Sequence, residues 1–198
     1  MTDLLILSIQ FKNQITKSEL IEIFYELENN GFELQKTIKT YEPLNMLTIN
    51  DRNGIIDTLL TRSDSRAILN MMINNNIFDF NCFIENEYIH IYRTDVRDGR
   101  LVGNNILEVD FYKKLINLIT NIDISFDSER AGISVHRSHL QLDFEKMTFS
   151  TLNLFDYIYG NKEMINQIQT NESELKVYQT INIMNRCLLI INGVPLSI

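Results

Sequence analysis

Proline and glycine are scarce in this 198-residue chain, which contains two prolines and seven glycines. Linkers between domains are usually rich in these residues, and no such stretch divides the sequence. About 200 residues can bury a hydrophobic core without the help of disulfides or metals. We therefore expect residues 1–198 to form one compact domain.

Cysteine is equally rare, with Cys82 and Cys187 as the two copies. Both lie in apolar segments that read as strands, where a thiol usually packs as a small buried hydrophobe. Two such residues do not make a disulfide framework, so we expect a reducing environment.

Long apolar runs are absent as well. The opening residues, MTDLLILSIQF, contain only four consecutive apolar residues and an acidic residue at position 3. A signal peptide needs a basic start and a longer apolar core, and a membrane helix needs about 18 or more apolar residues. The sequence therefore predicts a soluble cytoplasmic protein that makes no membrane contact.

Positive charge is in deficit, with 18 Lys and Arg against 26 Asp and Glu and a formal net charge of −8. The deficit belongs to the N-terminal half, because residues 1–92 hold seven basic and thirteen acidic residues. Such a surface repels nucleic acid and attracts basic proteins. We expect no direct nucleic-acid binding.

The clearest structural pattern is a hairpin at residues 77–93, IFDFNCFIENEYIHIYR. Ile89 and Ile91 alternate with polar or aromatic residues, which is the period-2 signature of a strand with two different faces. Phe78 and Phe80 repeat the alternation in the first strand, and the polar residues 85–87 form the turn between the two. This hairpin is expected near the centre of a sheet.

The best-specified helix follows Thr16. Thr16 and Glu19 have the spacing of a capping box, in which the two side chains satisfy free backbone groups at the start of a helix. Gly31 supplies a left-handed residue at its end. Its inward face is Leu20, Ile23, Phe24 and Leu27.

Taken together, the patterns predict an α+β fold with a largely antiparallel sheet, helices on one face, and the coarse order β-(αββ)x4. The predicted helices begin near residues 16, 64, 107 and 150, whereas residues 50–54 read as a turn and 55–62 are ambiguous. The second helix would bury Ala67, Ile68, Met71 and Met72, and the fourth would use Leu152, Leu154, Phe155 and Ile158. Gly160 would break this fourth helix, and residues 162–168 would continue as another helix. The predicted strands include 3–11, 32–41, 44–49, 132–137, 139–144, 175–184 and 186–191.

The spacing of the predicted helices, roughly 43–48 residues, falls in the range of internal repeats. The units share no residue signature, so we interpret the spacing as a generic feature of an α+β chain.

Three histidines are the candidates for metal or catalytic chemistry. His136 and His139 could share a metal on a helix, but their flanks read as strands, where positions three apart face opposite ways. His90 could form a catalytic dyad with Cys82 on the paired strand, although a half-buried histidine among tyrosines is much commoner. We expect no metal site, no cofactor and no catalytic residue.

The loop at residues 95–100, DVRDGR, combines two acidic residues and two arginines around a glycine. Arginine side chains can bind phosphates or carboxylates through paired hydrogen bonds. The preferred interpretation is an Asp-Gly turn with its charges in water.

The strongest surface feature is the acidic face of the first helix. A row of glutamates is usually just the solvated side of a helix, but it can also dock a basic protein and accelerate the encounter. The partner-binding candidates are Glu19, Glu22, Glu26, Glu28 and Glu33, with Asp51 and Asp57 as neighbours.

These observations favour a small acidic protein-binding module. The main hypothesis is an inhibitor or immunity-type protein that neutralises a basic toxin or nucleic-acid-acting enzyme. One alternative is a hydrolase or transferase with a site assembled around Asp95, His90, His136 and His139. A second is a structural subunit of a larger assembly, which exposed aromatic patches would reveal.

Overall fold

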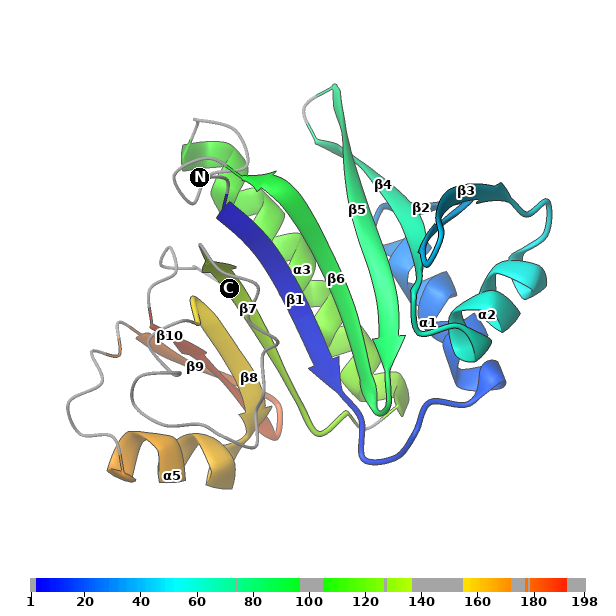
Figure 1. Ribbon diagram of the computed structural model, residues 1–198. Helices are drawn as coiled ribbons and strands as arrows, with labels where there is room; N and C mark the ends of the chain where they lie inside the picture. Colours follow the sequence, from blue (N-terminus) through cyan, green and yellow to red (C-terminus); the bar gives the residue numbers. More distant parts are fainter. Residues whose placement is uncertain are drawn as a thin grey trace.

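The computed structural model describes residues 3–73, 75–96, 105–126, 128–136, 155–171, 177 and 179–191. Within these ranges the chain forms a ten-stranded antiparallel sheet and four helices (Figure 1). The strand order is β3-β2-β4-β5-β6-β1-β7-β8-β10-β9. The expected α+β class with a largely antiparallel sheet is confirmed.

The elements follow one another along the chain with these bounds: β1 Asp3–Gln10, α1 Lys17–Asn29, β2 Phe32–Tyr41, β3 Leu44–Thr48, α2 Arg52–Thr61, β4 Ser65–Ile73, β5 Asn76–Glu85, β6 Tyr88–Val96, α3 Asn105–Phe126, β7 Arg130–His136, β8 Tyr157–Asn161, α5 Lys162–Asn171, β9 Gln179–Ile183 and β10 Arg186–Ile190.

Two hydrophobic cores lie on opposite faces of the sheet. The larger core joins α1, α2 and α3 to one face, and in Figure 1 α3 runs behind β1 and β6. Along β10, Leu188 belongs to this larger core, whereas Cys187 and Leu189 pack with Ile165 of α5 in the smaller one. Because successive strand residues point to opposite faces, α5 covers the other face of the sheet, at β8 and β10.

The predicted central hairpin is confirmed. β5 and β6 join through a turn in which Asn86 adopts a positive φ of 53°. Ile89 and Ile91 are buried on the helix side, and His90 lies on the opposite face.

The predicted helix beginning near residue 64 is wrong, because this segment is strand β4. Ala67, Leu69 and Met71 are buried with a period of two, and Met72 is 62% exposed. The apolar residues on its outer face hid this alternation from the sequence reading.

The helix of this region is α2, which begins at Arg52 within the stretch that reads as a turn. Asp51 caps it by accepting a hydrogen bond from the backbone N of Gly54 at 2.7 Å. The Asp and Asn residues that favour turns are also good N-cap residues, so composition alone does not separate the two.

The fourth predicted helix is also wrong where the structure describes it. Ile158 lies in strand β8, whereas the further helix expected at residues 162–168 is confirmed as α5. Gly160 does not break a helix; it is part of β8, where a Cβ atom would lie 2.2 Å from Cε of Met164. The predicted strand 139–144, residues 151–154 and the Asp-Gly part of the 95–100 loop lie outside the described residues.

The first, third and last predicted segments are confirmed as α1, α3 and the β9–β10 pair. In the described ranges the helices begin at Lys17, Arg52, Asn105 and Lys162, so the regular spacing expected from the sequence is not observed. None of the helices described has the length and hydropathy needed to cross a bilayer.

The capping box of α1 tests how much one helix end contributes to stability. Thr16 Oγ1 accepts from the backbone N of Glu19 at 3.3 Å, and Glu19 Oε2 accepts from the backbone N of Thr16 at 2.8 Å. We expect Thr16→Ala to lower the free energy of unfolding by about 1 kcal/mol. Thr16→Ser keeps the oxygen and should lose little. Urea denaturation measures both, and equal stability of the alanine variant and the natural chain would contradict the role of the cap.

Candidate functional site

The outer side of α1 carries a row of acidic side chains. Glu19, Glu22 and Glu26 follow one another at intervals of three and four residues, which places them on one side of the helix. Tyr25 lies in this row and is 53% exposed. We call Glu19, Glu22, Tyr25 and Glu26 the acidic stripe.

The acidic stripe lowers the stability of helix α1, because it places like charges next to one another. Like charges spaced three or four residues apart destabilise a helix by about 0.2–0.5 kcal/mol per pair. Glu22 and Glu26 form no ion pair within the described part of the chain. Their negative charge therefore stays available to a partner.

Two of the predicted acidic residues are neutralised between α1 and α2. Lys17 Nζ lies 2.6 Å from Asp57 Oδ1, and Arg52 forms an ion pair with Glu28. The Arg52 guanidinium also lies over the ring of Tyr25, 4.2 Å from its centroid. These contacts link α2 to α1 and place Arg52 against the ring of Tyr25, within the acidic stripe.

The other predicted residues have separate positions. Asp51 is occupied in capping α2. Glu33 follows the buried Phe32 on β2 and pairs across the strands with Asn70, so it lies on the face of the sheet away from α1. The structure therefore brings together Glu19, Glu22 and Glu26, with Glu28 and Asp57 at the edge of the surface.

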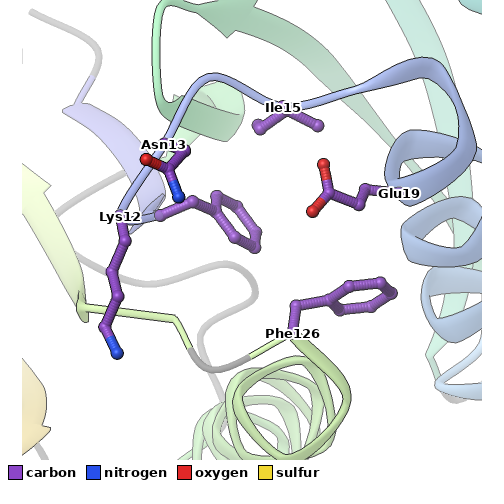
Figure 2. Close-up of a pocket in the computed structure, with 6 residues that line it drawn as sticks. Lys12, Asn13, Ile15, Glu19 and Phe126 are labelled. Carbon is purple, nitrogen blue, oxygen red and sulfur yellow. The ribbon is translucent and has the colours of Figure 1, made fainter.

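A small pocket opens beside Glu19 (Figure 2). Its volume is about 200 Å³, and it is lined by Phe11, Lys12, Asn13, Ile15, Glu19 and Phe126. Figure 2 shows the carboxylate of Glu19 pointing into the space between Ile15 and Phe126, with the Lys12 amino group directed away.

The chemistry of this pocket suits a cationic side chain. Hydrogen bonds from the Thr16 side chain and backbone lower the pKa of Glu19, so its carboxylate stays ionised at neutral pH. Aromatic and aliphatic walls around a carboxylate can take the alkyl stem and charged end of a lysine or arginine. Typical small-molecule pockets are larger, about 300–1,000 Å³.

His90 is a buried structural residue rather than one member of a dyad with Cys82. Its Nδ1 lies 2.7 Å from Oγ of Ser8, and its ring stacks between Phe83 and Tyr88 at centroid distances of 4.6 and 5.6 Å. Cys82 is fully buried in the core on the other face of the sheet. Burial also raises the Cys82 pKa to about 12, which keeps the thiol protonated.

The other histidine candidates are not brought together in the described structure. His136 ends β7, and His139 lies outside the described residues. Among the residues that the structure describes, no cluster of three His, Cys, Asp or Glu side chains could hold a metal ion.

No family model and no curated protein matches the chain. A solved structure, the Pseudomonas aeruginosa T6SS protein PA0821, is similar with a TM-score of 0.42 and 10% sequence identity. The alignment covers 96% of this chain and 68% of that one. So distant a likeness assigns neither family nor function.

The sequence analysis missed a buried polar network between α3, β8 and β10. Asp123 accepts hydrogen bonds from Nε and Nη2 of Arg186 at 3.0 and 2.8 Å, and from the hydroxyls of Ser128 and Tyr159, both at 2.9 Å. Burial and the Asp123 charge raise the pKa of Tyr159, so its hydroxyl remains a donor. No sequence signal could link Asp123 to Arg186, because 63 residues separate them.

This network should be important for stability. We expect Asp123→Ala to lower the free energy of unfolding by about 3–5 kcal/mol, because it leaves the Arg186 charge buried without its partner. The double variant Asp123→Ala with Arg186→Met removes both charges and should be less destabilised than Asp123→Ala alone. Urea unfolding compares the two, and a double variant that is less stable than the single one would contradict this account.

His90 gives the fold a specific pH dependence. Burial, and then the nearby charge of Arg66, lower its pKa from 6.5 to about 4. Between these values the unfolded chain binds a proton that the folded chain does not, so stability falls as pH drops from 6.5 towards 4. The loss should reach about 3 kcal/mol. Comparing the natural chain with His90→Asn by urea unfolding at several pH values isolates this contribution, which is absent if the two slopes are equal.

Proposed function

We propose that this protein is a protein-binding module that docks a basic protein through the acidic stripe of α1. The observation that carries the proposal is the pair of carboxylates at the exposed Glu22 and the half-buried Glu26, which have no ion pair in the described structure. A helix bears this repulsion at a cost to its own stability, and a basic surface relieves it.

Two further features support docking at this position. Tyr25 offers a large exposed ring that the Arg52 guanidinium lies against, and tyrosine is among the residues that contribute most binding energy at interfaces. The pocket at Glu19 lies next to the stripe and can receive a lysine or arginine from the partner. Charge guides the encounter, and these two features add specific contacts.

The biological form of this function that we favour is an inhibitor or immunity-type protein. A row of carboxylates can occupy the cationic groove that a toxin or nucleic-acid-acting enzyme uses for phosphates. Rapid association is what such an inhibitor needs, and complementary charge provides it. The cytoplasmic location stays a prediction.

The test compares two charge-reversed variants. Glu22→Lys with Glu26→Lys reverses the stripe, and Glu42→Lys with Glu163→Lys makes the same charge change at exposed positions outside it. Each chain is used to capture proteins from the source cell's lysate, followed by elution with a salt gradient. We expect a basic protein that the natural chain and the control retain and that moderate salt releases.

The stripe variant should lose that protein and should keep its thermal stability, since it removes a like-charge repulsion. Equal capture by all three chains would show that the stripe does not bind, and loss from the control as well would show that only net charge matters. Either result would reject the proposal.

A role as a structural subunit is the second candidate, because a specific observation favours it. Large apolar side chains, including Leu44, Met46, Met72 and Ile77, are exposed on one face of the sheet. Soluble monomers rarely expose such a group together, which favours contact with another protein chain on this face.

A further inference from the structure

One part of the sheet has no helix over its outer face within the described structure. We call the outer face of β3, β2, β4 and β5 the open leaf. Along β4, Ala67, Leu69 and Met71 point to the helices α1 and α2, so Arg66 and Met72 point outward onto the open leaf. α5 covers β8 and β10, at the other end of the sheet.

The open leaf is rich in exposed apolar surface. Of the nine large hydrophobic side chains exposed in the described part of the chain, five lie here. They are Tyr41, Leu44, Met46, Met72 and Ile77, with exposed fractions of 42%, 70%, 54%, 62% and 63%. Large exposed apolar patches mark sites that bind another protein, a membrane or a ligand.

Two cations lie next to each other at one end of the open leaf. Lys39 and Arg66 are direct cross-strand partners, an arrangement that is unfavourable for like charges. The Tyr41 ring is 5.0 Å from Lys39 Nζ and 5.7 Å from Arg66 Cζ. Arg66 also stacks on Phe83 at 4.0 Å, and its Nη1 donates to backbone oxygens of Ser63 and Ser65.

Neither cation has a carboxylate partner in the described structure. The nearby Asp64 is already bound by Arg62 through hydrogen bonds of 3.1 and 2.9 Å. The hydrogen bonds of Arg66 to carbonyl oxygens hold its position and leave its charge uncompensated.

Two acidic residues lie at the other end of the open leaf. Glu33 and Asp79 both pair across the strands with Asn70, and both are exposed. Within the described structure, Arg93 donates to the backbone oxygen of Asp79 and forms no ion pair with the Asp79 carboxylate. Asn70 is four residues from Arg66, about 13 Å along a strand, which exceeds the screening length of about 8 Å at physiological salt. The acidic end therefore does not neutralise the basic end within one molecule.

We propose that the open leaf binds the open leaf of a second copy of this chain, forming a two-fold symmetric dimer. The axis lies in the plane of the interface and crosses the strands between the rows of Arg66 and Asn70. Lys39 of each copy then faces Glu33 of the other, and Arg66 faces Asn70, which Glu33 and Asp79 flank on the neighbouring strands. A two-fold interface must be complementary to itself, and a surface with opposite charges at its two ends meets that condition.

The size of the surface agrees with this occupant. Four strands about 4.8 Å apart and up to ten residues long cover roughly 20 by 30 Å, or about 600 Å² in projection. Because side chains protrude from the sheet, the accessible area of the open leaf is larger than this projected area. It approaches the value of about 800 Å² per partner that is typical of a standard interface. Two sheets can pack face to face about 10 Å apart with their side chains interleaved.

The position of α5 leaves room for the second copy. β5 pairs with β6 only from Asn81 to Glu85, and Figure 1 shows the two strands separating beyond this stretch. The open leaf is therefore separated from the half of the sheet that carries α5 at its Ile77 end, whereas at its other end the Tyr41 side chain is hydrogen-bonded to Tyr92 of β6. The acidic stripe is on the opposite side of the sheet, so this proposal does not rest on the proposed function.

The test is an exchange of charges between two variants. Variant one is Lys39→Glu with Arg66→Glu, and variant two is Glu33→Lys with Asp79→Lys. Each variant paired with itself brings like charges together. A mixed pair regains both contacts, one with the natural charges and the other with the signs exchanged. Light scattering after size-exclusion chromatography measures mass over a wide range of protein concentrations.

We expect the natural chain to show twice the 23.2 kDa of one chain, each variant alone to be a monomer, and the equimolar mixture to regain the dimer mass. A natural chain that stays monomeric at its highest soluble concentration would overturn the proposal. Variants that remain dimeric alone, or a mixture that stays monomeric, would equally overturn it, because another surface or another alignment would then be involved.

A milder pair keeps the test valid if Arg66→Glu fails to fold. The single variants Lys39→Glu and Glu33→Lys exchange the charges that the proposed axis places directly opposite on β2. Circular dichroism checks that each is folded. We expect each single variant alone to form a weaker homodimer and the mixture of the two to regain the dimer mass. A mixture that does not regain the dimer mass would reject the proposed alignment of the two open leaves.

Discussion

The backbone pairing of β1 with two strands distant in sequence is the constraint on which the structure depends. β1 pairs with β6 on one side and with β7 on the other, joining residues 3–10 to residues 88–96 and 130–136. Leu7 and Ile9 then reach the helix-covered core, while Ile6 joins the core beneath α5. Because the side-chain period of a strand is two, this register assigns every neighbouring residue to one face or the other, and it places His90 opposite Ser8.

Segments whose local chemistry agrees with their tertiary position were predictable from the sequence. Thr16 and Glu19 cap α1 through contacts three residues apart, and the 77–93 hairpin alternates cleanly because one of its faces is buried. β4 was misread because Ile68 and Met72 place apolar residues on its outer face, which blurs the alternation. α2 was missed for a related reason, since Asp51 is as suitable for a turn as for a helix cap.

The acidic surface was predictable only along α1. Glu22 and Glu26 belong to one helix, so helical spacing alone places them together. Gly31, with a φ of 91°, ends the helix and lets the chain reverse its direction. Glu33 follows this reversal and therefore lies on the other side of the sheet. Without α2, the sequence could not show that Glu28 and Asp57 have cationic partners. The Asp123–Arg186 pair was beyond local reasoning because folding alone brings α3 and β10 together.

The two faces of the sheet have complementary roles in the proposed functions. A dimer formed through the open leaf hides the exposed apolar side chains and leaves both acidic stripes on the outside, because α1 lies on the opposite side of the sheet. One dimer then presents two docking surfaces for a basic partner. A partner, or an assembly of partners, can offer two basic sites that both stripes of one dimer reach. Binding of the second stripe is then intramolecular, so the dimer binds more tightly than a single stripe does. Modest electrostatic contacts, which salt weakens individually, would then give a long-lived complex.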